Sequence, residues 1–198
     1  MNEEQRWIAA ARNGDQESFE KLVRLYEKRV FSLTSRMCRN SADAEEAAQE
    51  AFLAAWQALP AFRGDASFAT WLYRLVSNAC VDILRREGRH QVMAGDEESS
   101  PEPPDKSPSP HALAERAELR RQIEAGLAAL PPEYRQVLIL REIHQCTYDE
   151  IAQICSIDLG TVKSRINRGR KRLRKILLES GNFSAAGASK KTEKEGCR

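Results

Sequence analysis

The cations near the end of the chain are the residues whose types and spacing point most directly to chemistry. Between Leu159 and Lys175 the sequence contains eight Lys or Arg residues and no Asp or Glu. A helix of this composition can hold phosphates along its length, whereas a solvated helical face normally mixes charges of both signs. The segment from Thr147 to Lys175 has the pattern of two short helices with a tight turn between them. It predicts a helix-turn-helix, Tyr148 to Asn167, whose second helix enters the major groove of DNA.

The elements that position this helix are predicted from small and apolar residues around the turn. Ala152 falls where the first helix must be narrow for its partner to cross. Helical spacing puts further apolar residues in a shared core: Ile151, Cys155, Ile157, Val162 and Ile166. Upstream, a long helix near His111–Leu130 is expected to stop at Pro131-Pro132, and a second helix to span Glu133–His144.

Four helices are predicted in the first part of the chain. One spans about Glu3–Arg12, and Asp15 caps the second, whose apolar residues recur at helical spacing. The third is capped by Ser41 and ended by Pro60, with an alanine-rich stripe that allows close packing. The fourth runs from about Ser67 to Arg86. No segment has the alternation of a strand, so we expect an all-α protein.

An acidic stripe is predicted on the face of the third helix opposite its alanines. Its members recur every three or four residues: Asp43, Glu46, Gln49, Glu50 and Leu53. An ordinary solvated face would explain the spacing, but no Lys or Arg lies between Ser41 and Phe52. A stripe of one sign that ends in an exposed leucine is suited to a basic partner helix.

Aromatic and cationic residues gather around the start of the fourth helix. Four rings lie in or just after the loop before it: Phe62, Phe68, Trp71 and Tyr73. The polar side of that helix carries Arg74, Asn78, Arg85 and Arg86. Rings beside cations suit unstacked bases and a phosphate backbone, and the loop therefore predicts binding of single-stranded or locally opened nucleic acid. We expect Phe68 and Trp71 to be core residues, and Phe62 to lie outside the core.

A polar segment divides the chain into two helical blocks. Residues 99–110 consist only of Ser, Pro, Glu, Asp and Lys, which cannot bury apolar area, so a flexible acidic linker is predicted. A disordered tether and a strand that mimics nucleic acid in a positive channel are both compatible with it. The predicted architecture is therefore two small helical domains, the second containing the helix-turn-helix.

Composition excludes several other classes of protein. The net charge is only +2, so acidic regions offset the basic helix. The five cysteines are scattered and odd in number, as in a protein of the reducing cytosol, and their spacing predicts no metal site. No apolar run approaches the roughly 20 residues of a membrane span, and the first residues lack the pattern of a secretory signal. We expect a cytoplasmic protein with no metal, no cofactor and no direct membrane insertion.

Four ordered motifs together resemble the alternative bacterial sigma factors of the extracytoplasmic-function (ECF) group, in the sigma-70 family. They are DAEEAAQEAFLAAW, FRGDASFATWLYRLVSNACVDILRR, LPPEYRQVLILREI and TYDEIAQICSIDLGTVKSRINRGRKRLRK. The resemblance covers roughly Asp15–Leu178 and spans both blocks and the linker. One departure is Asp158, where relatives often have Pro, but an Asp there still favours a helix N-terminus.

The resemblance implies roles for residues of the first block. The acidic stripe, Asp43, Glu46, Gln49, Glu50 and Leu53, would dock on core RNA polymerase, which replaces the interpretation as a solvated face. The loop and the fourth helix would open the promoter −10 element and hold a flipped base, through Phe62, Arg63, Gly64, Asp65, Ser67, Trp71, Arg74 and Asn78.

The second helix of the helix-turn-helix would read the −35 element. By resemblance the residues nearest base edges are Lys163, Ser164, Asn167 and Arg168. Those better placed for phosphates are Thr161, Arg165, Arg170, Lys171 and Arg172. The linker would thread toward the polymerase active site.

The resemblance also implies an organisation and a set of partners. Residues 1–88 would form the sigma region 2 domain, 89–111 the linker, 112–179 the region 4 domain and 180–198 a disordered tail. The partners would be core RNA polymerase, promoter DNA in double-stranded and locally melted form, and an anti-sigma factor. Catalysis would belong to the polymerase, with no small-molecule substrate for this chain. A free-standing helix-turn-helix repressor, a helical adaptor and an enzyme are the rival interpretations, and promoter-specific run-off transcription separates them.

Overall fold

The structure is a computed structural model that describes residues 2–91 and 110–179, and every regular element in these two ranges is a helix. The first block contains α1 (Glu3–Arg12), α2 (Gln16–Met37), α3 (Ser41–Ala58), the short 3₁₀ helix η1 (Leu59–Ala61) and α4 (Phe68–Gln91). The second contains α5 (Pro110–Ala128), α6 (Pro132–Leu138), the π-helical turn η2 (Ile139–Ile143), α7 (Tyr148–Cys155) and α8 (Leu159–Glu179). The predicted all-α fold is confirmed, and the expected tail at 180–198 lies outside the described residues.

Local capping explains where the first helices begin. Asp15 accepts a hydrogen bond from the backbone N–H of Ser18, as predicted for the start of α2. Gly14 before it has φ +91°, a left-handed conformation that favours glycine, and this turn separates α1 from α2. The cap of α3 differs from the expected one: Asn40 accepts from the N–H of Asp43, and Ser41 is the first helical residue.

The alanine stripe of α3 is the centre of the first block. Ala44, Ala47, Ala51 and Ala55 are all buried, and α3 packs against both α2 and α4. Because alanine side chains are short, neighbouring helices can approach closely while larger residues on α2 and α4 fill the space. Pro60 follows α3 inside η1, where the α-helix ends as predicted.

The second block packs α6 against α8 and places α7 beside both α8 and η2. A Cβ at Gly169 on α8 would lie 3.2 Å from the side chain of Leu138, so this glycine permits the close crossing of α6 and α8. The helix expected over Glu133–His144 is not continuous. It changes from α to π geometry at Ile139.

The helix-turn-helix forms as predicted. Thr147 and Glu150 form a reciprocal capping box at the start of α7. Ser156 ends α7 in the left-handed conformation, with φ 53°. Asp158 then accepts hydrogen bonds from the hydroxyl group of Thr161 and from its N–H, the latter at 2.8 Å, and these bonds lower the pKa of the Asp158 carboxyl group. The aspartate therefore caps the start of α8.

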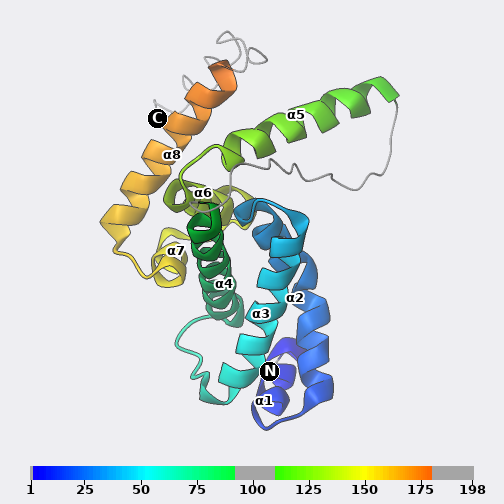
Figure 1. The fold of residues 1–198 in the computed structure, drawn as a ribbon. Helices are drawn as coiled ribbons and strands as arrows, with labels where there is room; N and C mark the ends of the chain where they lie inside the picture. The colour runs from blue at the N-terminus through cyan, green and yellow to red at the C-terminus, as the bar shows by residue number, and fades with distance from the viewer. Residues whose placement is uncertain (1, 92–109, 180–198) are drawn as a thin grey trace, which may run out of the picture.

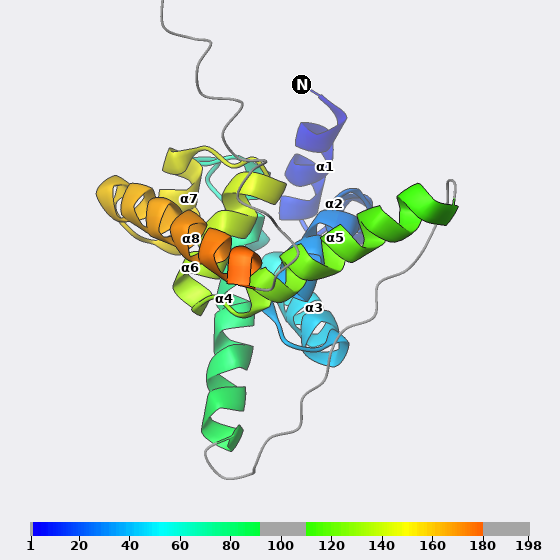
Figure 2. The same ribbon diagram turned by 90° about the horizontal axis from the view of Figure 1, so that it is seen from above.

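The two blocks also pack against each other, a contact that the sequence did not predict. Figure 1 shows α4 between α3 on one side and α7 on the other, and α2 contacts both α5 and α6. Figure 2 shows α5 extending away from the other helices toward its N-terminal end. The described helices extend into the range expected for the linker, 89–111, since α4 continues to Gln91 and α5 begins at Pro110. Residues 92–109, with most of the acidic segment, lie outside the described residues.

Candidate nucleic-acid and polymerase interfaces

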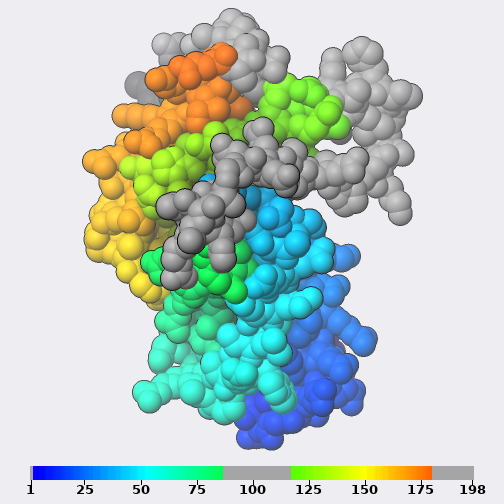
Figure 3. Space-filling view, in the orientation of Figure 1, coloured from blue at the N-terminus to red at the C-terminus, as the bar shows by residue number. Residues whose placement is uncertain are grey.

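The first half of α8 presents a polar face to solvent. The four residues predicted nearest base edges, Lys163, Ser164, Asn167 and Arg168, are all exposed. Val162 and Ile166, between them on the helix, are buried in the core of the block. Figure 3 shows α8, in orange, along an outer edge of the molecule. Capping by Asp158 and packing of the apolar face together fix the helix and direct this recognition face outward.

Two cations in the second half of α8 are held by partners in their own block. Arg170 donates to Glu142 on η2, with its Nη2 atom 2.6 Å from Oε1, and this hydrogen bond raises the pKa of the arginine. The guanidinium carbon of Arg172 lies 4.7 Å from the centre of the Tyr134 ring, a cation–π contact. Within the described residues, Lys171 has neither an ion pair nor a hydrogen bond from its side chain. The cations predicted to bind phosphate therefore differ in whether their side chains already have a partner within the protein.

The acidic stripe lies on α3 and is partly neutralised by a residue from α4. Arg86 binds two of its carboxylates, 3.0 Å from Glu46 and 3.1 Å from Glu50, and these contacts raise the pKa of the arginine. The sequence shows no cation within the stripe itself. We had expected Arg86 to lie on the side of α4 that binds nucleic acid, so its pairing with the stripe was not predicted. Leu53 remains 62% exposed, which leaves an apolar residue at the end of the stripe.

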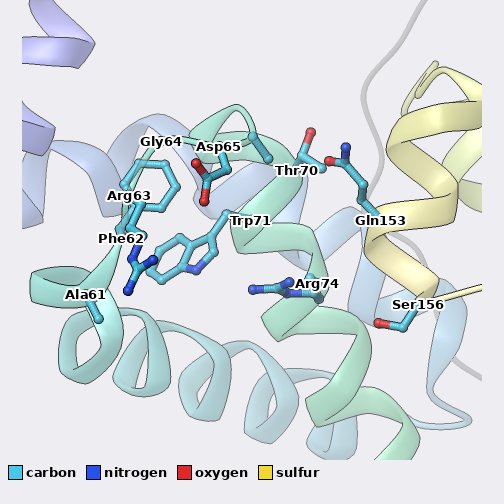
Figure 4. Close-up of a pocket in the computed structure, with 11 residues that line it drawn as sticks. Ala61, Phe62, Arg63, Gly64, Asp65, Thr70, Trp71, Arg74, Gln153 and Ser156 are labelled. Atoms are coloured by element: carbon cyan, nitrogen blue, oxygen red, sulfur yellow. The ribbon is translucent and has the colours of Figure 1, made fainter.

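A cavity of about 480 Å³ opens beside the loop before α4. Gly64, with φ +81°, turns the loop, and Ser67 caps α4 by accepting from the N–H of Thr70 at 3.1 Å. Figure 4 shows the residues that line the cavity, among them Arg63, Asp65, Trp71 and Arg74 from the first block. The loop and the first turns of α4 are brought together as predicted.

One expectation for this loop is wrong. The Phe62 ring is only 9% exposed and packs 5.0 Å from the Trp71 ring and 5.9 Å from the Phe68 ring. It therefore belongs to the core, because the loop folds back over the start of α4, although it also lines the cavity (Figure 4). Asn78 is exposed on α4 but does not line the cavity with Asp65.

Two residues that sequence reasoning missed complete the cavity from the other block. Gln153 and Ser156, at the end of α7, line it opposite Thr70 and Arg74 (Figure 4). No local pattern signals this role, because it depends on how α7 packs against α4. In the described parts of the chain, no group of three His, Cys, Asp or Glu side chains is arranged to hold a metal. Nor does any helix in those parts have the length and apolar character needed to cross a membrane.

Comparisons with known proteins agree with this geometry. The family "Sigma-70 region 2" matches residues 22–90 and "Sigma-70, region 4" matches residues 120–173. The ECF RNA polymerase sigma-E factor of Escherichia coli strain K12 is 37% identical over 83% of this chain and 88% of its own length. The ECF RNA polymerase sigma factor SigE of Mycolicibacterium smegmatis is 34% identical over 86% of this chain, which spans 66% of that relative.

A solved structure shares the fold. The sigma factor RpoE in complex with the anti-sigma factor NepR, from Bartonella quintana, superimposes with a TM-score of 0.68 at 22% identity. The match covers 82% of this chain and 98% of that one. The family matches and the relatives more than 30% identical show that the chain belongs to the sigma-70 family of RNA polymerase sigma factors, in its ECF subfamily.

Proposed function

We propose that this chain acts as an alternative sigma factor, which binds bacterial core RNA polymerase and directs transcription initiation at promoters with specific −10 and −35 elements. The observation that carries the proposal is the exposed recognition face of α8, which follows a capped helix-turn-helix. Its cations Lys163 and Arg168 have no carboxylate partner among the described residues. Membership of the sigma-70 family identifies core RNA polymerase as the enzyme with which this DNA-binding protein acts.

The −35 element is assigned to α8. Lys163, Ser164, Asn167 and Arg168 would contact base edges, since the N-terminal part of a recognition helix lies deepest in the groove. Lys171 is the clearest candidate for a phosphate contact, whereas Arg170 and Arg172 must share their guanidinium groups with Glu142 and Tyr134. Thr161 and Arg165, both partly buried, complete the set near the backbone.

The −10 element is assigned to the cavity beside the loop and to the exposed side of α4. Arg63 and Arg74 supply positive charge for a displaced strand, and Asp65 supplies an acceptor for the polar edge of a flipped base. Gly64 and Ser67 shape the loop, and Trp71 forms part of the wall. Phe62, although largely buried, lines the cavity beside Trp71. Asn78 is placed to contact the strand outside the cavity.

The binding of core polymerase is assigned to the acidic stripe, which consists of Asp43, Glu46, Gln49, Glu50 and Leu53. Arg86 holds Glu46 and Glu50 in fixed positions, which lowers the conformational cost of docking against a basic surface. The exposed Leu53 adds apolar area at the end of the stripe.

The remaining assignments follow from this role. Residues 1–88 act as region 2, 112–179 as region 4 and 89–111 as the connection between them. The polymerase performs the chemistry, so we propose that this chain has no active site of its own and works in the bacterial cytoplasm, where polymerase and chromosome are found. An anti-sigma factor is a further proposed partner, by analogy with the Bartonella quintana complex.

Run-off transcription with purified core polymerase tests the proposal. Promoter DNA is first selected from a random pool by the reconstituted holoenzyme, and a selected promoter is then transcribed with and without this chain. We expect a discrete transcript only when the chain is present, and its loss with K163A/R168A. A chain that selects no DNA in the presence of polymerase, but binds a defined site alone, would instead indicate a free-standing repressor.

A further inference from the structure

The cavity beside the loop before α4 gathers polar side chains that have no partner inside the protein. Five exposed residues of this kind line it: Arg63, Asp65, Arg74, Gln153 and Ser156. None of their side chains forms a hydrogen bond or an ion pair with another described residue. They come from the loop, from α4 and from the end of α7, so three segments of the chain direct uncommitted hydrogen-bonding groups to one place.

Two of these residues make one part of the cavity positive. Arg63 lies in the loop and Arg74 on α4, and Asp65, which also lines the cavity, forms an ion pair with neither of them. A guanidinium group presents its N–H donors in a planar fork that matches the oxygens of a phosphate group. Two such groups without carboxylate partners are therefore suited to bind phosphate.

Beside the arginines the cavity has an aromatic surface and further polar groups. The rings of Phe62 and Trp71 have their centres 5.0 Å apart, and both line the cavity although they are largely buried. In the view of Figure 4 the Trp71 ring lies between the two arginine side chains. The Asp65 carboxylate accepts hydrogen bonds, and the Gln153 amide both donates and accepts them. A planar ring with donors and acceptors at its edge, such as a nucleobase, matches this set of groups.

We propose that this cavity is a binding site for a free nucleoside monophosphate. Arg63 and Arg74 bind its phosphate group, while Asp65 and Gln153 bind the polar edge of its base beside Trp71. The volume of about 480 Å³ lies within the roughly 300–1,000 Å³ that is typical of small-molecule sites. The site differs from the one assigned to a flipped base of the −10 element, because α7 of the second block contributes part of its lining.

A nucleotide in this cavity competes with promoter DNA. This competition rests on the proposed function, because the −10 strand is taken to use Arg63, Asp65 and Arg74 of the same cavity. A guanidinium fork that is occupied by the phosphate group of the nucleotide is not available to the backbone of a DNA strand. Binding of the nucleotide therefore lowers the affinity of the chain for single-stranded −10 DNA, which makes promoter recognition sensitive to the concentration of a free nucleotide.

Isothermal titration calorimetry of the full chain tests the site. The probes are the monophosphates of adenosine, guanosine, cytidine and uridine, and the separate parts of the ligand are inorganic phosphate and the four nucleosides. We expect at least one monophosphate to bind roughly tenfold or more tightly than inorganic phosphate and than its own nucleoside, because each part keeps only some of the contacts.

Two variants with matched controls locate the ligand. R74A removes a charged contact to the phosphate group and should weaken binding by roughly tenfold or more, whereas Q153A removes a neutral contact from α7 and should weaken it by about fivefold. R85A and Q57A are the controls. Arg85 is an exposed arginine of α4 that pairs with Asp82, Gln57 is an exposed glutamine of α3, and neither lines the cavity. Both controls should bind the nucleotide like the wild type.

Three results would overturn the proposal. One is inorganic phosphate that binds as tightly as every monophosphate, which would leave an anion site only. Another is Q153A with wild-type affinity, which would place the ligand on the first block alone. The third is a nucleotide that, at saturation, does not reduce the fluorescence anisotropy of a labelled single-stranded −10 oligonucleotide bound to the chain. Calorimetry needs neither polymerase nor promoter, so absent nucleotide binding is distinguishable from a failure of the proposed function, which would appear as absent run-off transcription by the wild type.

Discussion

The acidic stripe on α3 and the recognition face on α8 both carry charged side chains at the surface, but the charges are held differently. On α3, Glu46 and Glu50 bind the same arginine from a neighbouring helix. On α8, Lys163 and Arg168 have no such partner within the described residues, and it is farther along, at Arg170, that an intrablock carboxylate appears. Fixed carboxylates suit a rigid protein surface, whereas cations without partners remain available for DNA.

The largest effect is expected from charge reversal on α3. The double variant E46K/E50K removes both partners of Arg86 and opposes a basic docking surface, so co-purification with core polymerase should fall to roughly a tenth or less of the wild-type yield. Helical content should not change, since both residues lie at the surface of an otherwise intact helix.

A double reversal with the same charge change provides the control. Glu17 and Glu20 on α2 are exposed and, among the described residues, pair only with Lys21 and Arg24 one turn away. E17K/E20K should bind polymerase like the wild type. Equal losses in the two double variants would mean that net charge, rather than the stripe, governs association.

Substitutions along α8 test which of its cations contact bases and which contact phosphates. R168A should cost ~1–3 kcal/mol in DNA binding and relax preference at one base pair, if the arginine pairs with a guanine edge. K171A should weaken all sequences alike and reduce the salt slope of binding by about one unit. Fluorescence anisotropy on single-base −35 variants at several salt concentrations measures both, and a uniform loss in R168A would reassign Arg168 to phosphate.

Strand opening is tested at the cavity rather than at Phe62. D65A and N78A should leave the closed promoter complex nearly unchanged and reduce thymine reactivity to permanganate near −10, at ~1–3 kcal/mol for each base contact. F62A is a poor probe of the same step because it removes a buried ring. It should instead lower the free energy of unfolding, by ~3–5 kcal/mol. Unchanged permanganate reactivity in D65A would refute the assignment of the cavity.

A pH change tests the contact between the blocks. The pKa of His144 is about 4 where it packs against Tyr73, against ~6.5 for an ordinary histidine, so protonation weakens the packing of the two blocks. The stability that neutral His144 gives this packing is complete above pH 6.5 and is lost as the pH falls toward 4. Between pH 7.5 and 5.5 the equilibrium constant for packing of the two blocks should fall up to about tenfold. In H144E this response, read from the radius of gyration by small-angle X-ray scattering, should disappear.

The smallest effect should come from Arg170. Because Glu142 already neutralises its guanidinium group, R170A should weaken DNA binding less than K171A and change the salt slope by less than one unit. In E142A the arginine becomes available to phosphate, and DNA affinity should rise. An R170A loss equal to that of K171A would show that the ion pair opens freely on DNA.

The sequence by itself determined the helices and the order of the surfaces. Caps such as Asp15, Thr147 and Asp158 bind backbone N–H groups three residues away, so their partners are visible in the local sequence. The spacing of apolar residues identified the buried face of α3 and of α8, and with them the opposite, exposed faces. The cap at Asn40 was missed by one residue because Ser41 has the same local chemistry.

Only the tertiary structure decided which distant side chains meet. The pairing of Arg86 with the acidic stripe depends on how α4 crosses α3, and the burial of Phe62 depends on the path of a loop over α4. In the same way, Gln153 reaches the cavity because α7 packs on α4, and His144, which follows η2, reaches Tyr73 of α4. Periodicity tells which face of a helix is apolar. Which other element packs against that face is decided by the folding of the whole chain.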